Sequence, residues 1–174
     1  MGGNRPKANG AMGQDRVALP GPADYRWCRM LDPQSVIPHR PPFLFVDEVL
    51  ELDAEHAVCV RTFRADEGFY AGHYPGNPIT PGVLLCESVF QAGAIFLTKR
   101  LEAQGQSAAG KTPVLCRIEE AKFKGMVFPG DRVTIEVRPV ETLQQFHFMT
   151  GTVRRDGKAV LTLRYALALV DKTA

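Results

Sequence analysis

The stretch GHYPGNPITPGVLLCESVFQAGAIFL, residues 72–97, decides the fold of this chain. Its first eleven residues include three prolines and three glycines, which restrict the backbone at some positions and free it at others. From residue 82 onward the only polar side chains are Glu87, Ser88 and Gln91. A helix that is apolar on every side is buried rather than exposed on a surface. The stretch therefore predicts a stiff loop that leads into a buried central helix.

Glu87 is the only carboxyl group in this part of the predicted helix. Because an ionised carboxylate is costly in apolar surroundings, burial favours the protonated form, which is a proton donor at neutral pH. Gln91 follows four residues later on the same helix face, and we expect it to orient the carboxyl group by a hydrogen bond. A structural Glu87, paired with a cation or reaching solvent at the helix start, is the alternative.

The loop before the helix carries a histidine, His73, which can accept a proton near neutral pH. Thr80 is the expected N-cap of the helix, and Pro81 suits its first position. The free N–H groups of Gly82 and Val83 would then favour a negatively charged oxygen, such as that of a thioester carbonyl losing its α-proton. Loop and helix together predict an acid–base site.

Residues 72–92 resemble the active-site signature of the FabZ-type 3-hydroxyacyl-acyl-carrier-protein dehydratases. The family's lead-in has its counterpart in IPHRPPFLFVD, residues 37–47. A later family stretch is matched by AKFK at residues 121–124 and PGD at residues 129–131. The resemblance keeps the family's order from residue 37 to the C-terminus. It implies a hotdog fold, in which a curved antiparallel sheet wraps one long helix.

The resemblance also implies a mechanism. His73 would remove the α-proton of a 3-hydroxyacyl thioester, Glu87 would protonate the departing hydroxyl, and the N–H of Gly82 would polarise the carbonyl. The acyl group would arrive on the phosphopantetheine of acyl carrier protein, and no other cofactor and no metal is expected. In the family the histidine and the acid of one site come from different subunits, which implies a dimer or a trimer of dimers.

Some positions depart from the family pattern. Tyr74 stands where phenylalanine is commonest, and Phe90 is bulkier than the family's usual residue, so both are expected to shape the acyl tunnel beside Gly82, Val83 and Gln91. The related FabA-type enzymes, which also isomerise the double bond, carry aspartate where this chain has glutamate. This difference favours dehydration alone and leaves isomerisation open.

The remaining sequence predicts two strands, the helix and then four strands, an α+β layout. A hairpin is expected at Asp156-Gly157. Residues 31–174 are expected to form one domain, and residues 1–30 a flexible extension, because residues 1–22 hold five glycines, three prolines and few large apolar side chains. The predicted strands span residues 43–52, 57–63, 114–123, 133–138, 146–153 and 160–170.

Composition and charge argue against a nucleic-acid-binding, a membrane-spanning and a secreted protein. The net charge of +2, without a basic stripe, argues against nucleic acid, and polar residues interrupt the one helix that resembles a membrane span. The absence of an apolar leader and of paired cysteines predicts a cytoplasmic protein with reduced, mostly buried thiols.

Three further histidines, His39, His56 and His147, are not spaced for a metal site and are expected to be structural. Lys122, Lys124 and Arg132 are candidate contacts for acidic acyl carrier protein.

Two further function classes stay open. A hotdog thioesterase would activate water against the same thioester, although hydrolysis has no need of a base aimed at the α-carbon. A non-catalytic module would bind acyl chains or carrier protein, although it would not need both titratable groups. Free acid as the product indicates the first alternative, and binding without turnover the second.

Overall fold

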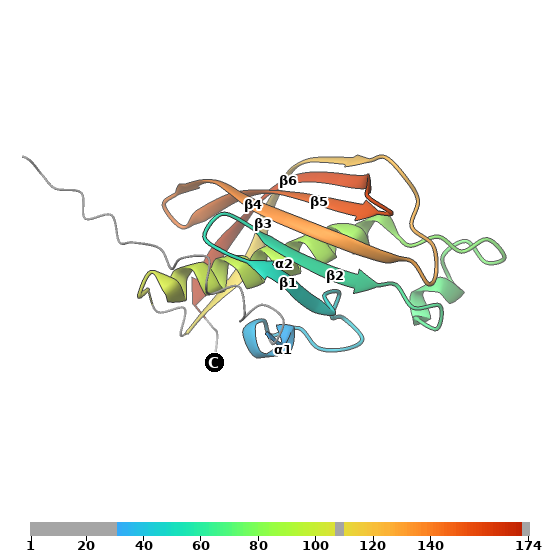
Figure 1. The fold of residues 1–174 in the computed structure, drawn as a ribbon, viewed down its shortest axis with the longest axis horizontal. Helices are drawn as coiled ribbons and strands as arrows, with labels where there is room; N and C mark the ends of the chain where they lie inside the picture. Colours follow the sequence, from blue (N-terminus) through green and yellow to red (C-terminus); the bar gives the residue numbers. More distant parts are fainter. Residues whose placement is uncertain (1–30, 107–109, 172–174) are drawn as a thin grey trace, which may run out of the picture.

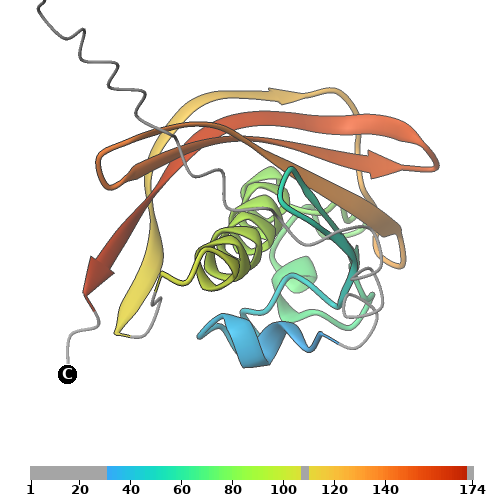
Figure 2. The ribbon, with the colours of Figure 1, turned by 60° about the vertical axis from the view of Figure 1, so that its left-hand side comes forward.

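The computed structural model describes residues 31–106 and 110–171, so the predicted extension at residues 1–30 lies outside the described residues. A six-stranded antiparallel sheet curves around one long helix, α2 (Gly82–Ala103), as Figures 1 and 2 show. The strand order is β1-β2-β4-β5-β6-β3, and this arrangement confirms the α+β hotdog fold. The strands are β1 (Glu48–Leu52), β2 (Ala57–Thr62), β3 (Lys111–Phe123), β4 (Arg132–Leu143), β5 (Phe146–Arg155) and β6 (Lys158–Asp171).

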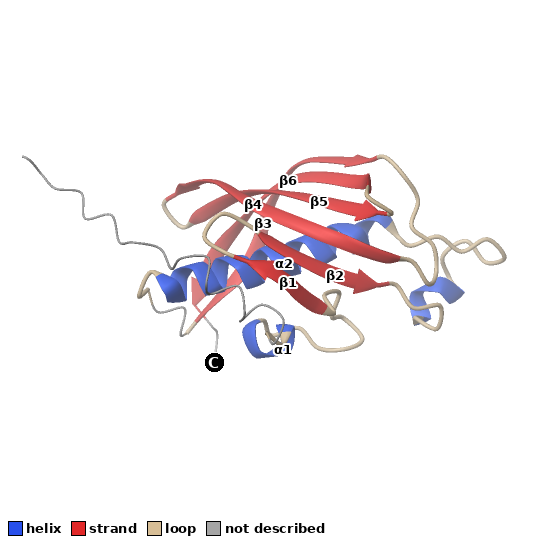
Figure 3. Ribbon diagram, viewed as in Figure 1, coloured by secondary structure: helices blue, strands red, loops and turns tan. Residues whose placement is uncertain are grey.

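Two short helices complete the described part, α1 (Pro33–Val36) and the 3₁₀ helix η2 (Gly68–Ala71) (Figure 3). The core lies between α2 and the concave face of the sheet, where apolar side chains of both are buried. One residue of α2 departs from the expected burial, because Val83 in its first turn is 73% exposed. By length and composition α2 could cross a membrane, but 67% of its most apolar window is buried in the domain, as in a core helix.

The first turn of α2 differs from the prediction. Pro81 is the N-cap, so the expected Thr80 cap is wrong. The Thr80 hydroxyl instead shares a 2.6 Å hydrogen bond with the buried Tyr70 hydroxyl, which takes it away from the helix. At the other end Gly105, at φ +68°, lets the chain turn back, and its N–H donates to the carbonyl of Glu102. The helix therefore begins after Pro81 and ends before the left-handed turn at Gly105.

The predicted strand at residues 43–52 is only half formed, because β1 begins at Glu48. The physical reason is that the N–H of Phe45 donates to the side chain of Gln91 at 2.7 Å rather than to a neighbouring strand. The predicted hairpin at Asp156-Gly157 is confirmed, with φ angles of 50° and 74°, both in the left-handed region that a tight β-turn of this kind requires.

Glycines let the helix approach the sheet closely. A Cβ at Gly93 of α2 would collide with the hydroxyl of the fully buried Tyr165 on β6, which donates to the carbonyl of Val89 at 3.3 Å. Burial raises the pKa of that phenol, so it stays protonated and bonded. The absence of a side chain at Gly93 is therefore a requirement of the helix–sheet packing.

We expect Gly93→Ala to lower the free energy of unfolding by about 1–3 kcal/mol, the usual cost of overpacking a core. Urea denaturation measures it. Gly68→Ala is the matched control, because a Cβ there meets nothing within 4 Å and its stability should hardly change. Equal stability of both variants with the wild type would contradict the packing described here.

Strand β3 lies at the edge of the sheet and is exposed along most of its length. Its large apolar side chains include Ile118, which is 49% exposed, and Phe123. Cys116 is also on this strand and is exposed, whereas Cys59 and Cys86 are buried, in line with the prediction of mostly buried thiols; Cys28 lies outside the described residues. A long apolar edge of this kind invites pairing with another chain.

Candidate active site

The loop of residues 72–80 protrudes at the end of the molecule where α2 begins (Figure 1). Its base is anchored on two sides, since the N–H of Thr80 donates to the carbonyl of Val127 at 2.7 Å and the N–H of His73 donates to the carbonyl of Phe69 at 3.1 Å. Tyr74 has a φ of 55°, which is uncommon for a bulky residue. The anchors hold this part of the backbone in a defined conformation.

The hydrogen bond of His73 selects one tautomer of its ring. Nδ1 lies 2.8 Å from the carbonyl oxygen of Ile79, and a carbonyl can only accept, so Nδ1 carries the hydrogen. The neutral ring then presents Nε2 as a bare lone pair. A histidine held in this way is ready to act as a base through Nε2.

The carboxyl group of Glu87 is held by the side chain that was expected to orient it. Gln91 Nε2 donates to Glu87 Oε1 at 2.9 Å, which confirms the predicted hydrogen bond. Gln91 is itself fixed, because Nε2 also donates to the carbonyl of Phe43 at 3.1 Å and Oε1 accepts from the N–H of Phe45 at 2.7 Å. The Glu87 side chain is 21% exposed, so the acid is half-buried and reaches the surface.

The N-terminus of α2 supplies donors near the acid. The N–H groups of Gly82 and Val83 lie in the first helical turn, where no carbonyl of the helix can accept from them. Pro81 caps the helix without a side-chain hydrogen bond, so it does not occupy these donors. Both groups therefore remain suited to an anionic or polarised oxygen.

His73 and Glu87 have separate partners within one chain. His73 bonds to Ile79, and Glu87 is bonded by Gln91, while no hydrogen bond or ion pair joins the two across the described ranges 31–106 and 110–171. The acid and the base are therefore each held by a partner of their own.

Comparisons with known proteins assign the chain to a family and agree with its fold. The model of the FabA-like domain family matches residues 37–164, most of the chain. The chain belongs to this family. It is 41% identical over 136 residues to the 3-hydroxyacyl-[acyl-carrier-protein] dehydratase FabZ of Symbiobacterium thermophilum, covering 76% of this chain and 92% of the relative. The FabZ protein of Anaeromyxobacter dehalogenans is 36% identical over 140 residues, covering 80% and 88%.

A solved structure shares the fold. The dehydratase heterocomplex ApeI:P of Xenorhabdus doucetiae superposes with a TM-score of 0.68 at 17% sequence identity, covering 82% of this chain and 93% of that one. This likeness shows a shared fold, in keeping with the hotdog fold that the sequence resemblance implied.

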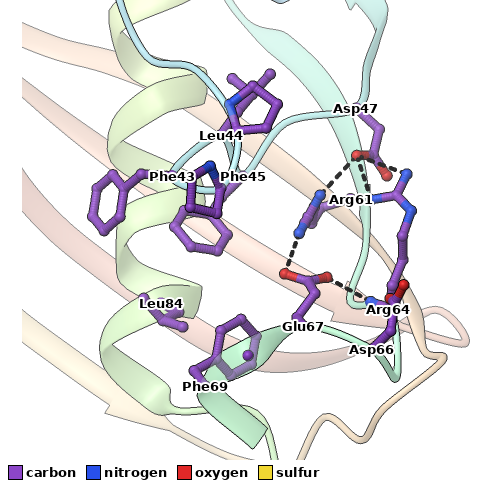
Figure 4. Close-up of a pocket in the computed structure, with 13 residues that line it drawn as sticks. Phe43, Leu44, Phe45, Asp47, Arg61, Arg64, Asp66, Glu67, Phe69 and Leu84 are labelled. Atoms are coloured by element: carbon purple, nitrogen blue, oxygen red, sulfur yellow. Dashed lines mark hydrogen bonds and ion pairs between the residues drawn. The ribbon is translucent and has the colours of Figure 1, made fainter.

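A pocket of about 750 Å³ lies between the segment before β1, the η2 region and the first turn of α2 (Figure 4). Phe43, Phe45, Phe69 and Leu84 make its apolar wall, and neither His73 nor Glu87 lines it. The pocket is linked to Glu87 only through Gln91. The side chain of Gln91 forms hydrogen bonds with the backbone of Phe43 and Phe45, both of which line the pocket. Of the other expected substrate contacts, Tyr74 is exposed and Phe90 is buried, and neither lines this pocket.

The polar side of the pocket is an ion-pair network that sequence reasoning missed. The guanidinium of Arg61, only 5% exposed, donates to Asp47 Oδ1 at 2.9 Å and to Glu67 Oε2, and lies against the rings of Phe45 and Phe63. Asp47 also accepts from the N–H of the residue after Arg61. The network connects β2 to the segment before β1. It therefore stabilises the backbone of Phe43 and Phe45, with which Gln91 forms hydrogen bonds.

This network is not suited to bind an anion. Its cations, Arg61 and Arg64, face three carboxylates, those of Asp47, Asp66 and Glu67. Two of these, Asp47 and Glu67, already pair with Arg61, and Arg64 lies 3.4 Å from Asp47. Its role is structural, and the lead-in motif at residues 37–47 was the signal for it, since Asp47 ends that motif.

Other groups near the site are not poised for chemistry. Burial, and the neighbouring Glu87 carboxyl, raise the pKa of the Cys86 thiol, which disfavours the nucleophilic thiolate. Among the residues that the structure describes, no three His, Cys, Asp or Glu side chains are grouped as metal ligands. His56 pairs with Asp53 at 3.0 Å, and His147 lies 3.2 Å from the Thr142 hydroxyl, both away from the acid.

His39 is the residue whose place sequence reasoning did not anticipate. It was expected in the turn before the first strand without a role, yet its Nε2 lies 3.6 Å from Glu87 Oε1. No sequence spacing indicates this contact, because the two residues are far apart in the chain and meet only when residues 37–47 pack against α2.

Proposed function

We propose that the protein dehydrates a (3R)-3-hydroxyacyl thioester, carried on acyl carrier protein, to the trans-2-enoyl thioester and water in fatty-acid-type biosynthesis. Membership of the FabA-like family and the similarity to the FabZ dehydratases support the reaction class. The observation that carries the proposal is the preparation of two groups: His73 with Nε2 free to accept a proton, and Glu87 with one oxygen held by Gln91.

In this mechanism His73 Nε2 takes the α-proton of the thioester. The charge that develops on the carbonyl oxygen is stabilised by the N–H groups of Gly82 and Val83 at the start of α2. Glu87 gives its proton to the 3-hydroxyl, the C–O bond breaks, and water leaves. One proton is taken and one is given, and no electrons are gained or lost, so the reaction needs no redox cofactor.

We infer that a second copy of the chain completes the site. His73 and Glu87 are not joined within one described chain, and the long apolar edge of β3 remains open to pairing. Association through this edge buries Ile118 and Phe123 and gives each site a neighbour that can supply the missing group. Whether two or six chains assemble stays a prediction, as does the cytoplasmic location.

The proposed contact with acyl carrier protein involves few free cations. Lys122 pairs with Glu120 at 2.8 Å, and Arg132 pairs with Glu48 at 3.5 Å. Lys124 has no ion pair in the part of the chain that the structure describes. It is therefore the best placed of the three predicted cations to meet an acidic partner or the phosphate of phosphopantetheine.

Mass spectrometry of the products tests the function. The protein is incubated with a short 3-hydroxyacyl thioester of acyl carrier protein, and the mass of the acylated carrier is followed. A loss equal to one water is the expected result. Release of free acid would instead establish a thioesterase, and an unchanged acyl group across several chain lengths would contradict the proposed reaction.

A further inference from the structure

His39 reaches the proposed acid from outside the helix. Its Nε2 lies 3.6 Å from Glu87 Oε1, and its ring stacks on Phe43 with centroids 6.5 Å apart. Its backbone is held in turn by Arg40, whose Nη1 donates to the carbonyls of Ile37 at 2.9 Å and His39 at 2.7 Å. The imidazole is thus placed by contacts on both its backbone and its ring.

The other ring nitrogen of His39 indicates where the hydrogen lies. Nδ1 is buried and has no hydrogen-bond partner in the described part of the chain. A buried N–H without an acceptor is costly and rare, whereas a buried lone pair without a donor is tolerated more often. The neutral ring therefore carries its hydrogen on Nε2, which points at the carboxyl of Glu87.

Glu87 Oε1 is then approached by two N–H donors. Gln91 donates to it from the same helix at 2.9 Å, and His39 faces it from the segment before β1. The 3.6 Å separation is slightly longer than a hydrogen bond, and such contacts often tighten only when substrate binds. In the protonated carboxyl group that the proposed dehydration requires, the oxygen facing two donors is the carbonyl-type oxygen, so the proton of that acid belongs on Oε2.

The geometry points to His39 as a positioning residue that acts with Gln91 to keep the proton of Glu87 on Oε2, the oxygen left to face the substrate hydroxyl. This inference rests on the proposed dehydration, in which Glu87 is the acid. Gln91 holds one oxygen of the carboxyl group from the same helix, and a donor from a separate element would restrict the rotation of the group further when the contact tightens. Orientation of this kind affects the chemical step rather than substrate binding.

Steady-state kinetics of two His39 variants test the role. His39→Phe keeps an aromatic ring against Phe43 but removes the donor, and we expect kcat to fall about 10- to 100-fold, the range for losing a residue that orients a reacting group. KM should change by less than about twofold, because ground-state binding is not involved. His39→Gln places an amide N–H near the position of Nε2 and should recover most of kcat.

A double variant separates positioning from a merely structural role. If His39 acts through Glu87, then His39→Phe combined with Glu87→Gln should be no slower than Glu87→Gln alone. Wild-type kcat for His39→Phe would overturn the inference, and so would a His39→Gln variant as slow as His39→Phe, because the donor alone would then not suffice. Should His39→Phe fail to fold, His39→Leu supplies the same comparison. An active Glu87→Gln protein would instead defeat the proposed acid, which distinguishes the two failures.

Discussion

Glu87→Gln should lower the dehydration rate by about 100- to 10,000-fold, the range for removing one general acid. The amide has no proton acidic enough to give to the leaving hydroxyl. The fold should be unaffected, because the amide has the same shape and its oxygen can still accept the hydrogen bond from Gln91. Initial rates with a 3-hydroxyacyl-carrier thioester measure the effect, and circular dichroism checks the fold.

Glu102→Gln is the matched control for this experiment. It makes the same chemical change on the same helix, in the last turn, where Glu102 pairs with Lys99 at 2.8 Å on the surface. Exposed ion pairs contribute little, so both activity and stability should stay near those of the wild type. A Glu87→Gln enzyme as fast as Glu102→Gln would show that Glu87 is not the acid.

Mixing two inactive variants, His73→Ala and Glu87→Gln, should restore about a quarter of wild-type activity once subunits exchange freely. The figure follows from counting for a dimer: half of the dimers are mixed, and each mixed dimer has one intact site if the two groups of a site come from different chains. This expectation rests on the proposed assembly, in which the second copy of the chain supplies the second group of each site; within the described residues no hydrogen bond or ion pair joins His73 to Glu87. Activity before and after exchange measures it.

A second mixture sharpens the result. When wild type is mixed with a chain carrying both substitutions, shared sites leave the mixed dimers inactive, so about a quarter of the activity should remain. If each site lay within a single chain, about half of the wild-type activity would remain. Subunit exchange is verified by mass-tagging one partner, so a failure of the first mixture to recover activity despite exchange would contradict the shared site.

Much of this architecture could be predicted from short stretches of the sequence. The loop and helix of residues 72–97 were predicted with the Gln91–Glu87 bond, because residues four apart on a helix meet whatever the fold around them. The hairpin at Asp156-Gly157 was equally predictable, since two left-handed residues suffice for its turn. Thr80 was misjudged because its hydroxyl bonds to the buried hydroxyl of Tyr70, a residue that lies too far back in the sequence to belong to a helix-capping pattern.

Contacts between segments far apart in the chain could not be predicted in this way. Periodicity and turn chemistry follow from interactions over a few residues, so the order of the elements and the helix that carries Glu87 and Gln91 could be predicted from the sequence. The approach of His39 to Glu87, the Arg61 network under Phe45, and the collision that forbids a side chain at Gly93 arise only when segments pack. Packing depends on the summed shape of many side chains, and no spacing along the chain encodes it.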